Sequence, residues 1–214
     1  MKPLVSVVVL TYNGKHFLEK LLPTLKSQTY EPLEVVVVDN NSTDGSAYFV
    51  KKNFPKFVLV ENKTNRGYCG GNNDGMRTAK GEYVAVINDD TECDPKWVSE
   101  AVKCMELSPR VGVVATKVLH LADKKTIDTV GININRDCSV LIRGSAKKDS
   151  GVYDSITQVF SGAGNGVFYR KEMLDEIGFF DEDFWIHYDE TDLCFRARLR
   201  GWSVYYTPTS LVYH

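Results

Sequence analysis

The stretch Val5-Ser6-Val7-Val8-Val9-Leu10-Thr11-Tyr12-Asn13-Gly14 opens the chain with an apolar run that ends in a polar turn. Residues 5–10 are mostly β-branched, which is typical of a strand buried on both faces of a parallel sheet. Leucines at helical spacing come next, and a second apolar run over 33–38 follows them. This order of strand, helix and strand predicts a βαβ unit, so we expect an α/β fold with a parallel, right-handed sheet.

The rest of the chain continues this alternation and then becomes more irregular. Asp94 and Pro95 predict the N-cap and the first residue of a helix that ends near residue 107. No repeat, linker or low-complexity tract divides the chain, so we expect one domain. The other expected elements are a strand over 57–60, a loop over the glycine-rich stretch 62–73, a helix closed by Gly81, strands over 83–87 and 111–115, loops and short antiparallel strands over 122–159, a strand over 167–169, helices over 171–177 and 192–200, and a strand over 203–206.

The composition is that of a globular domain and excludes several classes of function. The 214 residues are 43% hydrophobic and 25% charged, and a formal net charge of -2 without a long basic run predicts no nucleic-acid partner. The longest apolar stretches are far shorter than the roughly 20 residues of a membrane-spanning helix. Because the N-terminus has no signal-peptide pattern, we expect a cytoplasmic protein, and attachment to the inner face of the membrane through residues beyond this chain stays open.

The cysteines are spread along the chain without a Cys-x-x-Cys pair. An odd number at such spacings indicates neither a zinc site nor a disulfide framework. We therefore expect buried or incidental thiols at Cys69, Cys93, Cys104, Cys138 and Cys194.

Two adjacent carboxylates, Asp89 and Asp90, follow the apolar run 83–87 at the carboxyl end of a predicted strand. A charge beside an apolar strand is costly unless water, a hydrogen-bond donor or a cation compensates it. A divalent metal ion is the most specific candidate, and the alternative is a pair of ordinary turn residues before a helix. Because Asp94 supplies a better start for that helix, the pair is available for chemistry.

Three polar loops, beginning at Thr11, Asp39 and Asn88, each follow a predicted strand. A parallel sheet places such loops at one edge, where open α/β sheets bind their ligands. Neither a Gly-x-Gly-x-x-Gly after the first strand nor a P-loop occurs, which disfavours dinucleotide dehydrogenases and P-loop proteins. Asp39 could accept a hydrogen bond from a base and residues 40–43 could serve a ribose, but a cap cluster for the next helix explains the same residues equally well.

Three strings together resemble the family 2 glycosyltransferases of GT-A fold, and especially their rhamnosyltransferase-like branch. The resemblance implies transfer of a sugar from a nucleoside diphosphate donor with inversion at the anomeric carbon, usually with Mg²⁺ or Mn²⁺. It covers nearly the whole chain. The strings are residues 5–14 quoted above, Val38-Asp39-Asn40-Asn41-Ser42-Thr43-Asp44-Gly45-Ser46, and Asn65-Arg66-Gly67-Tyr68-Cys69-Gly70-Gly71-Asn72-Asn73.

The resemblance also implies a donor site and a metal site. Asp90 matches the most typical metal ligand of the family's DxD-type motif, and Asp89 replaces the proline that this branch usually carries. His214 matches a histidine that completes the metal shell in several relatives. The residues that the resemblance places around the donor are Thr11, Tyr12, Asn13, Asp39, Asn41, Arg66, Gly67, Asn72 and Asp89.

The segment His187-Tyr188-Asp189-Glu190-Thr191-Asp192-Leu193-Cys194 is similar to the family's acidic acceptor motif, with its first two acids exchanged. The family's catalytic base falls on Glu190, and Asp189 is the second choice. A carboxylate suits this role because the acceptor hydroxyl loses its proton as it attacks. Without the resemblance, these acids would be an acidic first turn that favours the helix dipole.

We therefore expect a single GT-A catalytic domain over 1–214, with a nucleotide-sugar half over 1–116 and an acceptor half over 117–214 that is truncated at its end. The expected donor is a UDP- or dTDP-sugar, and the expected acceptor is a saccharide or a lipid-linked molecule. A sugar nucleotidyltransferase is disfavoured because its glycine-rich basic loop is absent after the first strand. A nucleotide-sugar-binding domain without turnover is the non-enzymatic alternative.

Overall fold

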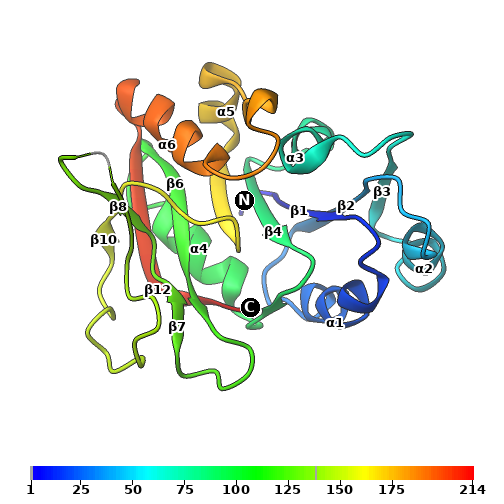
Figure 1. The fold of residues 1–214 in the computed structure, drawn as a ribbon, viewed down its shortest axis with the longest axis horizontal. Helices are drawn as coiled ribbons and strands as arrows, with labels where there is room; N and C mark the ends of the chain where they lie inside the picture. Colours follow the sequence, from blue (N-terminus) through cyan, green and yellow to red (C-terminus); the bar gives the residue numbers. More distant parts are fainter. Residues whose placement is uncertain (1, 138) are drawn as a thin grey trace.

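A ten-stranded sheet forms the centre of this computed structural model, which describes residues 2–137 and 139–214 (Figure 1). Its main path has the order β10-β12-β6-β11-β4-β1-β2-β3, while β5 pairs with β12 and β7 with β6. Neighbours among β1 to β4 run parallel, and β11 runs antiparallel between β4 and β6. This confirms the predicted α/β class. The strands are β1 Val5–Thr11, β2 Leu33–Asp39, β3 Val58–Glu61, β4 Tyr83–Asn88, β5 Glu92–Cys93, β6 Val111–Leu119, β7 Ile127–Thr129, β10 Thr157–Gln158, β11 Val167–Arg170 and β12 Ser203–Tyr213.

Helices cover both faces of the sheet, as the apolar character of the strands requires. One core joins α1, α2 and α4 to the sheet and contains Val5, Val7 and Val9 of β1. The other core joins α3, α5 and α6 to the opposite face, onto which Val8 of β1 projects. The helices are α1 Lys15–Lys26, α2 Ser46–Asn53, α3 Gly67–Thr78, α4 Trp97–Met105, α5 Lys171–Ile177, α6 Asp189–Leu199 and the 3-10 helix η1 Glu182–Phe184.

The prediction of a loop over 62–73 was wrong, because α3 begins at Gly67. Glycines lower helix propensity, yet here they permit close packing on β1. A Cβ atom at Gly71 would collide with Leu10, and one at Gly75 would collide with Val8 and lie 2.9 Å from Val38 Cγ2. The glycines are therefore a packing requirement of the helix and not a mark of a loop.

Gly75→Ala is expected to destabilise the protein, although alanine favours a helix by about 1 kcal/mol. The added methyl would meet two valine side chains that cannot turn away, and such overpacking costs about 1–3 kcal/mol. The melting temperature should fall by about 2–4 °C for each kcal/mol of net loss. Circular dichroism melts measure this, and an unchanged or raised melting temperature would show that α3 can shift away from β1.

Three other predicted boundaries also differ from the structure. The helix expected from Pro95 begins at Trp97, because the Asp94 carboxylate accepts from the Lys96 N–H at 2.9 Å in a turn that precedes it. The helix expected from residue 192 begins at Asp189, and so includes the whole acidic cluster. The last strand continues past residue 206 to Tyr213, since β12 pairs with β6 on both sides of a bulge.

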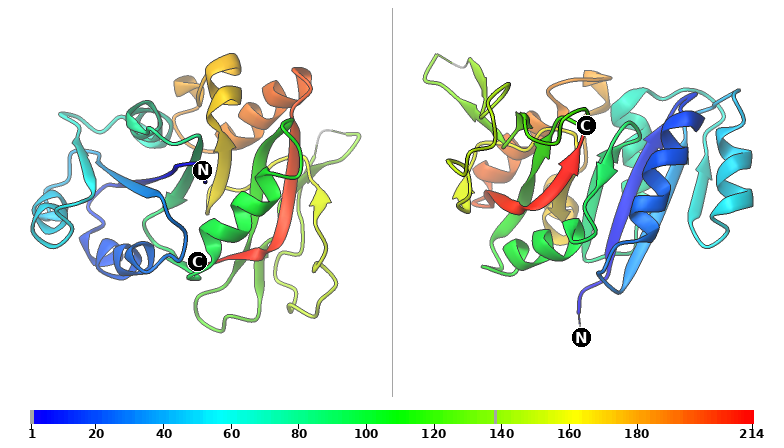
Figure 2. Two further views of the ribbon diagram at one scale, coloured as in Figure 1. Left: turned by 180° about the vertical axis from the view of Figure 1, so that it is seen from behind. Right: turned by 90° about the horizontal axis from the view of Figure 1, so that it is seen from below.

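A separate antiparallel hairpin, β8 (Ile132–Ile134) with β9 (Val140–Ile142), stands beside β12 in the second half of the chain (Figure 2). It fulfils the prediction of short antiparallel strands over 122–159. None of the helices within the described residues has the length and apolar character needed to cross a bilayer. Four cysteines are buried free thiols, as predicted, and Cys138 lies outside the described residues.

Candidate active site

The three polar loops meet at the carboxyl edge of the sheet, as predicted. Thr11 at the end of β1 is in register with Asp39 at the end of β2, and the Asn40 N–H donates to the Thr11 carbonyl at 2.9 Å. The Thr11 hydroxyl donates to Asp89 Oδ2 at 2.6 Å, which ties the loop after β4 to the loop after β1. Strand register thus brings together residues that are up to 78 positions apart in sequence.

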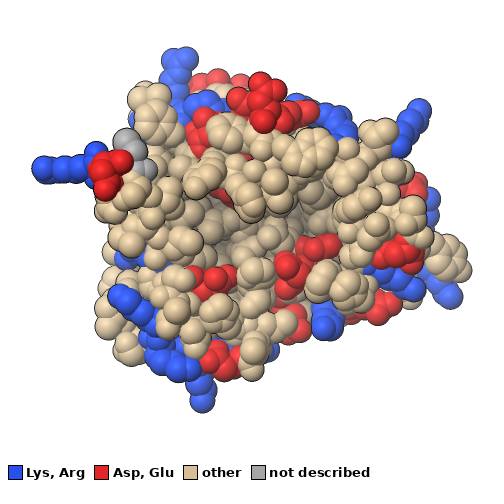
Figure 3. All heavy atoms as spheres, in the orientation of Figure 1, with Lys and Arg blue, Asp and Glu red and all other residues tan. Residues whose placement is uncertain are grey.

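A cavity of about 620 Å³ opens at this edge, and Figure 3 shows the hollow with acidic side chains on its rim. Asp89 and Asp90 from the loop after β4 line it together with Asp189 and Glu190 from the first turn of α6. Two acidic pairs that are about a hundred residues apart in sequence therefore share one cavity. Its apolar lining includes Ile132, Val140 and Ile142 of the β8–β9 hairpin and Ile186.

Asp90 belongs to a chain of three polar side chains. His214 Nε2 lies 3.4 Å from Asp90 Oδ2, and His214 Nδ1 lies 2.9 Å from Asp128 Oδ2. Hydrogen bonding to His214 lowers the pKa of Asp90, and hydrogen bonds to Asp128 and then Asp90 raise the pKa of His214 to about 10. The two carboxylates thus hold a positive charge between them.

The Asp90 side chain has the features expected of a metal ligand. Its Oδ1 atom is buried and has no hydrogen-bond partner among the described residues. Within residues 2–137 and 139–214, no group of three or more His, Cys, Asp or Glu side chains could hold a metal ion. Mg²⁺ in particular is commonly bound by one or two protein carboxylates together with substrate phosphates and water. Asp90 therefore fits a site that a nucleoside diphosphate would complete, and His214 would join it as a second ligand only after losing the proton that it holds between Asp90 and Asp128.

Asp89 faces away from His214 and toward the turn after β1. Burial raises the pKa of Asp89 to about 6, and the hydrogen bond from Thr11 opposes this rise. A side chain at Gly14 would collide with Asp89 Oδ2, so the turn approaches this carboxylate closely. The side chains of Asp89 and Asp90 therefore point in different directions, Asp89 toward the turn after β1 and Asp90 toward His214.

Asp189 and Glu190 begin α6 after an unusual stretch of backbone. Trp185, His187 and Tyr188 all have positive φ, at 60°, 72° and 64°, which costs about 1–3 kcal/mol for each residue that is not glycine. Burial raises the pKa of both carboxyl groups, and for Glu190 the nearby Asp189 charge adds to the rise. Asp189 Oδ2 is buried without a partner among the described residues. A carboxyl group with a raised pKa in a cavity is suited to proton transfer.

A smaller cavity of about 310 Å³ lies beside the first, against the loops predicted to bind the nucleoside. Tyr12, Gly67 and Asp89 line it, together with Trp185, whose indole ring packs directly against Gly67. Thr11 does not line this cavity and is connected to it only by its hydrogen bond to Asp89.

The other residues predicted for the nucleoside hold the loop after β2 in shape. Asp39 is buried and accepts from the Ser42 N–H at 3.1 Å. Asn13 Oδ1 accepts from the Thr43 N–H at 2.8 Å, and Asn41 is exposed with φ at 72°. These contacts shape the loop but do not cap α2, whose N-cap Gly45 has no side-chain cap hydrogen bond, and donor contact at these positions stays a prediction.

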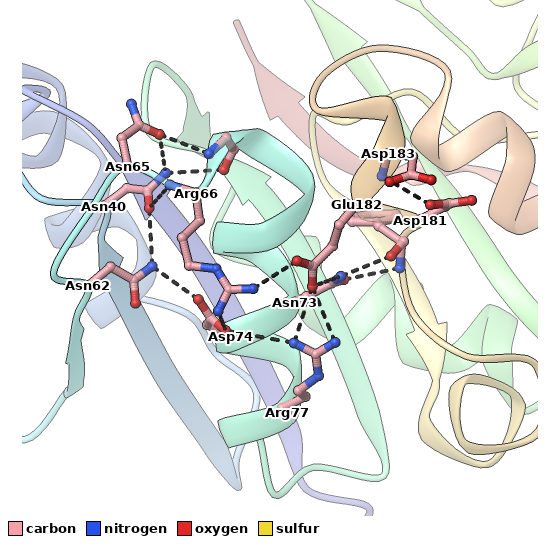
Figure 4. A network of polar contacts seen from close by, with 12 residues as sticks. Asn40, Asn62, Asn65, Arg66, Asn73, Asp74, Arg77, Asp181, Glu182 and Asp183 are labelled. Atoms are coloured by element: carbon pink, nitrogen blue, oxygen red, sulfur yellow. Dashed lines mark hydrogen bonds and ion pairs between the residues drawn. The ribbon is translucent and has the colours of Figure 1, made fainter.

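Arg66 belongs to an ion-pair network that connects α3 to the acidic segment before α6 (Figure 4). Its guanidinium lies 3.0 Å from Asp74 and 2.8 Å from Glu182, and Arg77 contacts Glu182 at 3.3 Å. Asn73 joins the same segment by donating to the Phe180 carbonyl at 2.9 Å. The network fixes the segment 180–184 to α3, and contact of Arg66 with the donor stays a prediction.

Asn72, predicted near the donor, is fully buried inside α3, where its Nδ2 donates to the Tyr68 carbonyl at 3.1 Å. Sequence reasoning missed Asp128, whose place beside His214 depends on the pairing of β7 with β6. It also missed the hairpin residues that line the larger cavity and the hydroxyl of Tyr68, although Tyr68 is part of a string that carried the resemblance. Tyr68 directly follows Arg66 and Gly67 in the sequence, and this position next to two predicted donor residues could have indicated it.

Comparison with known proteins identifies the family. The chain is 27% identical over 126 residues to an uncharacterized glycosyltransferase of Haemophilus influenzae, which covers 58% of this chain and 39% of that protein. It is 24% identical over 241 residues to an N-acetylglucosaminyl-diphospho-decaprenol L-rhamnosyltransferase of Mycobacterium tuberculosis, covering 100% of this chain and 76% of the relative. The chain thus spans well under two thirds of the Haemophilus relative.

The fold is similar to that of a mannosyltransferase from Pyrobaculum calidifontis, solved in complex with GDP-Man and Mn²⁺. The TM-score is 0.75 at 24% identity, over 100% of this chain and 57% of that one, which confirms the predicted GT-A fold. The model of the family described as Glycosyl transferase family 2 matches residues 6–199. This match covers most of the chain and confirms the resemblance of its sequence, so the chain belongs to glycosyl transferase family 2.

Proposed function

We propose that this chain is the catalytic domain of a metal-dependent, inverting glycosyltransferase. It moves a sugar from a UDP- or dTDP-sugar to a saccharide or lipid-linked acceptor. The observation that carries the proposal is that Asp90, a candidate metal ligand, and Glu190, a candidate base, line the same cavity at the carboxyl edge of the sheet. The donor half covers residues 1–116 and the acceptor half residues 117–214.

The proposed reaction is a single displacement. The acceptor oxygen attacks the anomeric carbon, the bond from that carbon to the diphosphate oxygen breaks, and Glu190 takes the proton of the acceptor hydroxyl. Attack on the face opposite the leaving group inverts the anomeric centre. The charged form of Glu190 is required, so its raised pKa predicts that the rate increases with pH above the ordinary glutamate pKa of 4.5.

Asp90 and His214 would hold Mg²⁺ or Mn²⁺, which when bound offsets the charge on the departing diphosphate. Carboxylate and phosphate oxygens are the donors that suit these ions, and the neutral imidazole of His214 would add one nitrogen donor. The structural relative from Pyrobaculum was solved with Mn²⁺ and a nucleotide sugar, which supports this choice.

The lining of the cavity favours a lipid-linked acceptor over a free saccharide. Val140, Leu141 and Ile142 are 39%, 49% and 50% exposed, and two of them line the cavity together with Ile186. A saccharide presents hydroxyl groups that such a wall cannot satisfy, whereas the apolar part of an amphiphile would cover it. An acceptor of this kind would place the protein at the inner face of a membrane.

Two other functions fit the observations less well. A sugar nucleotidyltransferase would need a glycine-rich basic loop after β1, and this chain has Thr11-Tyr12-Asn13-Gly14 there. A binding domain without turnover would have no need for the buried Asp189 and the partly buried Glu190, both with raised pKa values, in the cavity that Asp90 lines. Membership in glycosyl transferase family 2 further supports the transferase.

A thermal-shift screen with UDP, dTDP and GDP, each with and without Mn²⁺, tests the donor site. A ligand at 100 times its Kd adds about 2.7 kcal/mol, so the correct nucleotide with Mn²⁺ should raise the melting temperature by about 5–10 °C. Asp39→Asn should reduce this shift, while Glu61→Gln, on the exposed end of the neighbouring β3, should preserve it. A full shift without any metal, or pyrophosphate release from a nucleoside triphosphate and a sugar phosphate, would contradict the proposal.

A further inference from the structure

Tyr68 lines the larger cavity, and its hydroxyl group lies near two possible acceptors, Asn88 and Glu190. Tyr68 stands in the first turn of α3, and its hydroxyl donates to Asn88 Oδ1 at 3.2 Å. Glu190 Oε1 lies close to the same hydroxyl, because both oxygen atoms crowd the position that a Cβ atom at Gly164 would occupy. The hydroxyl therefore connects the strand end that carries Asp89 and Asp90 with the acidic turn of α6.

Gly164 shows how closely the two oxygen atoms approach each other. A Cβ atom at this position would lie 2.7 Å from the Tyr68 hydroxyl and would collide with Glu190 Oε1. Both oxygens therefore rest against the same backbone segment, which leaves no space for a side chain. This packing restricts where the Glu190 carboxylate can move.

Tyr68 has one hydrogen for two acceptors. Burial raises the pKa of Tyr68 well above its ordinary value, so the hydroxyl keeps its proton and donates to one acceptor at a time. Asn88 has a second contact, because its Nδ2 donates to Asn165 Oδ1 at 2.6 Å. Asn88 thus stays fixed when the tyrosine hydrogen turns away from it.

The surroundings of Glu190 disfavour its ionised form, so a hydrogen bond from the Tyr68 hydroxyl would stabilise the carboxylate. Burial and the Asp189 charge both disfavour ionisation, while the hydrogen bond from Tyr68 lowers the pKa of Glu190. The titratable groups around Glu190 and Asp189 are His187, Asp192 and Cys194 from the α6 region, Tyr68 and Cys69 from α3, and Tyr169 from β11.

We propose that Tyr68 is a positioning residue for the general base, donating its hydrogen to ionised Glu190 and to Asn88 once Glu190 holds the acceptor proton. The inference rests on the proposed function, because it requires Glu190 to be the base. Tyr68 lies beside the proposed base and would act on the reaction through it. Its effect is to favour the charged form and to orient the carboxylate.

Tyr68→Phe tests the proposal by removing one oxygen atom. A hydrogen bond to a charged group supports an expected fall in kcat of about 10- to 100-fold near neutral pH. The acidic limb of the pH profile should move to higher pH, the rate should recover partly above that limb, and the KM for the donor should change by less than about threefold. A loss that is equal at every pH, or an unmoved limb, would overturn the positioning role.

Tyr206→Phe is the control, because Tyr206 is a buried tyrosine on β12 outside the cavity, whereas the partly buried Tyr68 lines it. Its pH profile should equal that of the wild type. Should Tyr68→Phe fail to fold, site-specific 3-fluorotyrosine at position 68 replaces it, since its more acidic hydroxyl should move the limb to lower pH. An unmoved limb with fluorotyrosine would overturn the proposal.

Glu190→Gln separates this inference from the function on which it rests. If Glu190→Gln is inactive and the pH–rate profile of Tyr68→Phe equals that of the wild type, only the positioning role of Tyr68 is contradicted. An active Glu190→Gln would remove the base assignment itself.

Discussion

Asp90→Ala should lower the rate of sugar transfer by at least about 1,000-fold, because several kcal/mol of charge stabilisation on the departing diphosphate would be lost. The loss follows from the position of Asp90, whose buried Oδ1 lacks a partner and whose Oδ2 lies 3.4 Å from His214. Binding of the nucleoside diphosphate should also lose its dependence on Mn²⁺. A radiometric or coupled transfer assay and a metal titration measure the two effects.

Asp175→Ala is the control for Asp90→Ala. Asp175 forms an exposed ion pair with Lys171 on α5, away from the cavity, so its removal should leave transfer and Mn²⁺ dependence unchanged. If Asp90→Ala retained Mn²⁺-dependent transfer at the wild-type rate, Asp90 would not be a metal ligand.

Glu190→Gln should lower kcat by about 10²- to 10⁴-fold, which is the usual contribution of a positioned base. The amide has nearly the same shape as the carboxyl group and cannot accept the acceptor proton. Asp189→Asn provides the comparison, since it changes the neighbouring acid in the same cavity. A larger loss in Asp189→Asn than in Glu190→Gln would move the base to Asp189.

The stability of Glu190→Gln distinguishes a lost base from a damaged fold. The raised pKa of Glu190 means that the folded protein binds this proton more tightly than the unfolded chain. The free energy of unfolding of the wild type therefore falls as pH rises from about 4.5 through the folded pKa. Glutamine does not ionise, so the free energy of unfolding of the variant does not fall in this way. At alkaline pH the variant should be about 1 kcal/mol more stable than the wild type and should melt about 2–4 °C higher. At acidic pH the two melting temperatures should differ little.

The parallel half of the fold could be predicted from sequence because its signals are local. The apolar run of β1 shows burial on both faces, and the polar residues that follow β1, β2 and β4 must meet at one edge once the strands are parallel. The contact of Thr11 with Asp89 is a direct result of that register. The adjacent carboxylates Asp89 and Asp90, directly after an apolar strand, likewise indicated a site where the cavity lies.

The features that the sequence did not predict depend on contacts between segments that are distant in the chain. The length of β12 follows from its pairing with β6, which a local pattern ending near residue 206 could not show. Asp128 reaches His214 only because β7 folds back on β6, and α3 begins at Gly67 because its glycines pack on β1. Each of these features is set by a tertiary neighbour and leaves no periodic trace in its own segment.

The left-handed backbone of Trp185, His187 and Tyr188 has a consequence for engineering. Selection for thermostability alone would favour glycine or asparagine at these positions, because either residue adopts a positive φ at a lower energetic cost. The same changes would delete the indole against Gly67 and two side chains of the larger cavity's wall. Libraries for a more stable enzyme should therefore keep residues 185–188 constant and vary α1, α2 and α4, which lie on the opposite face of the sheet from α6.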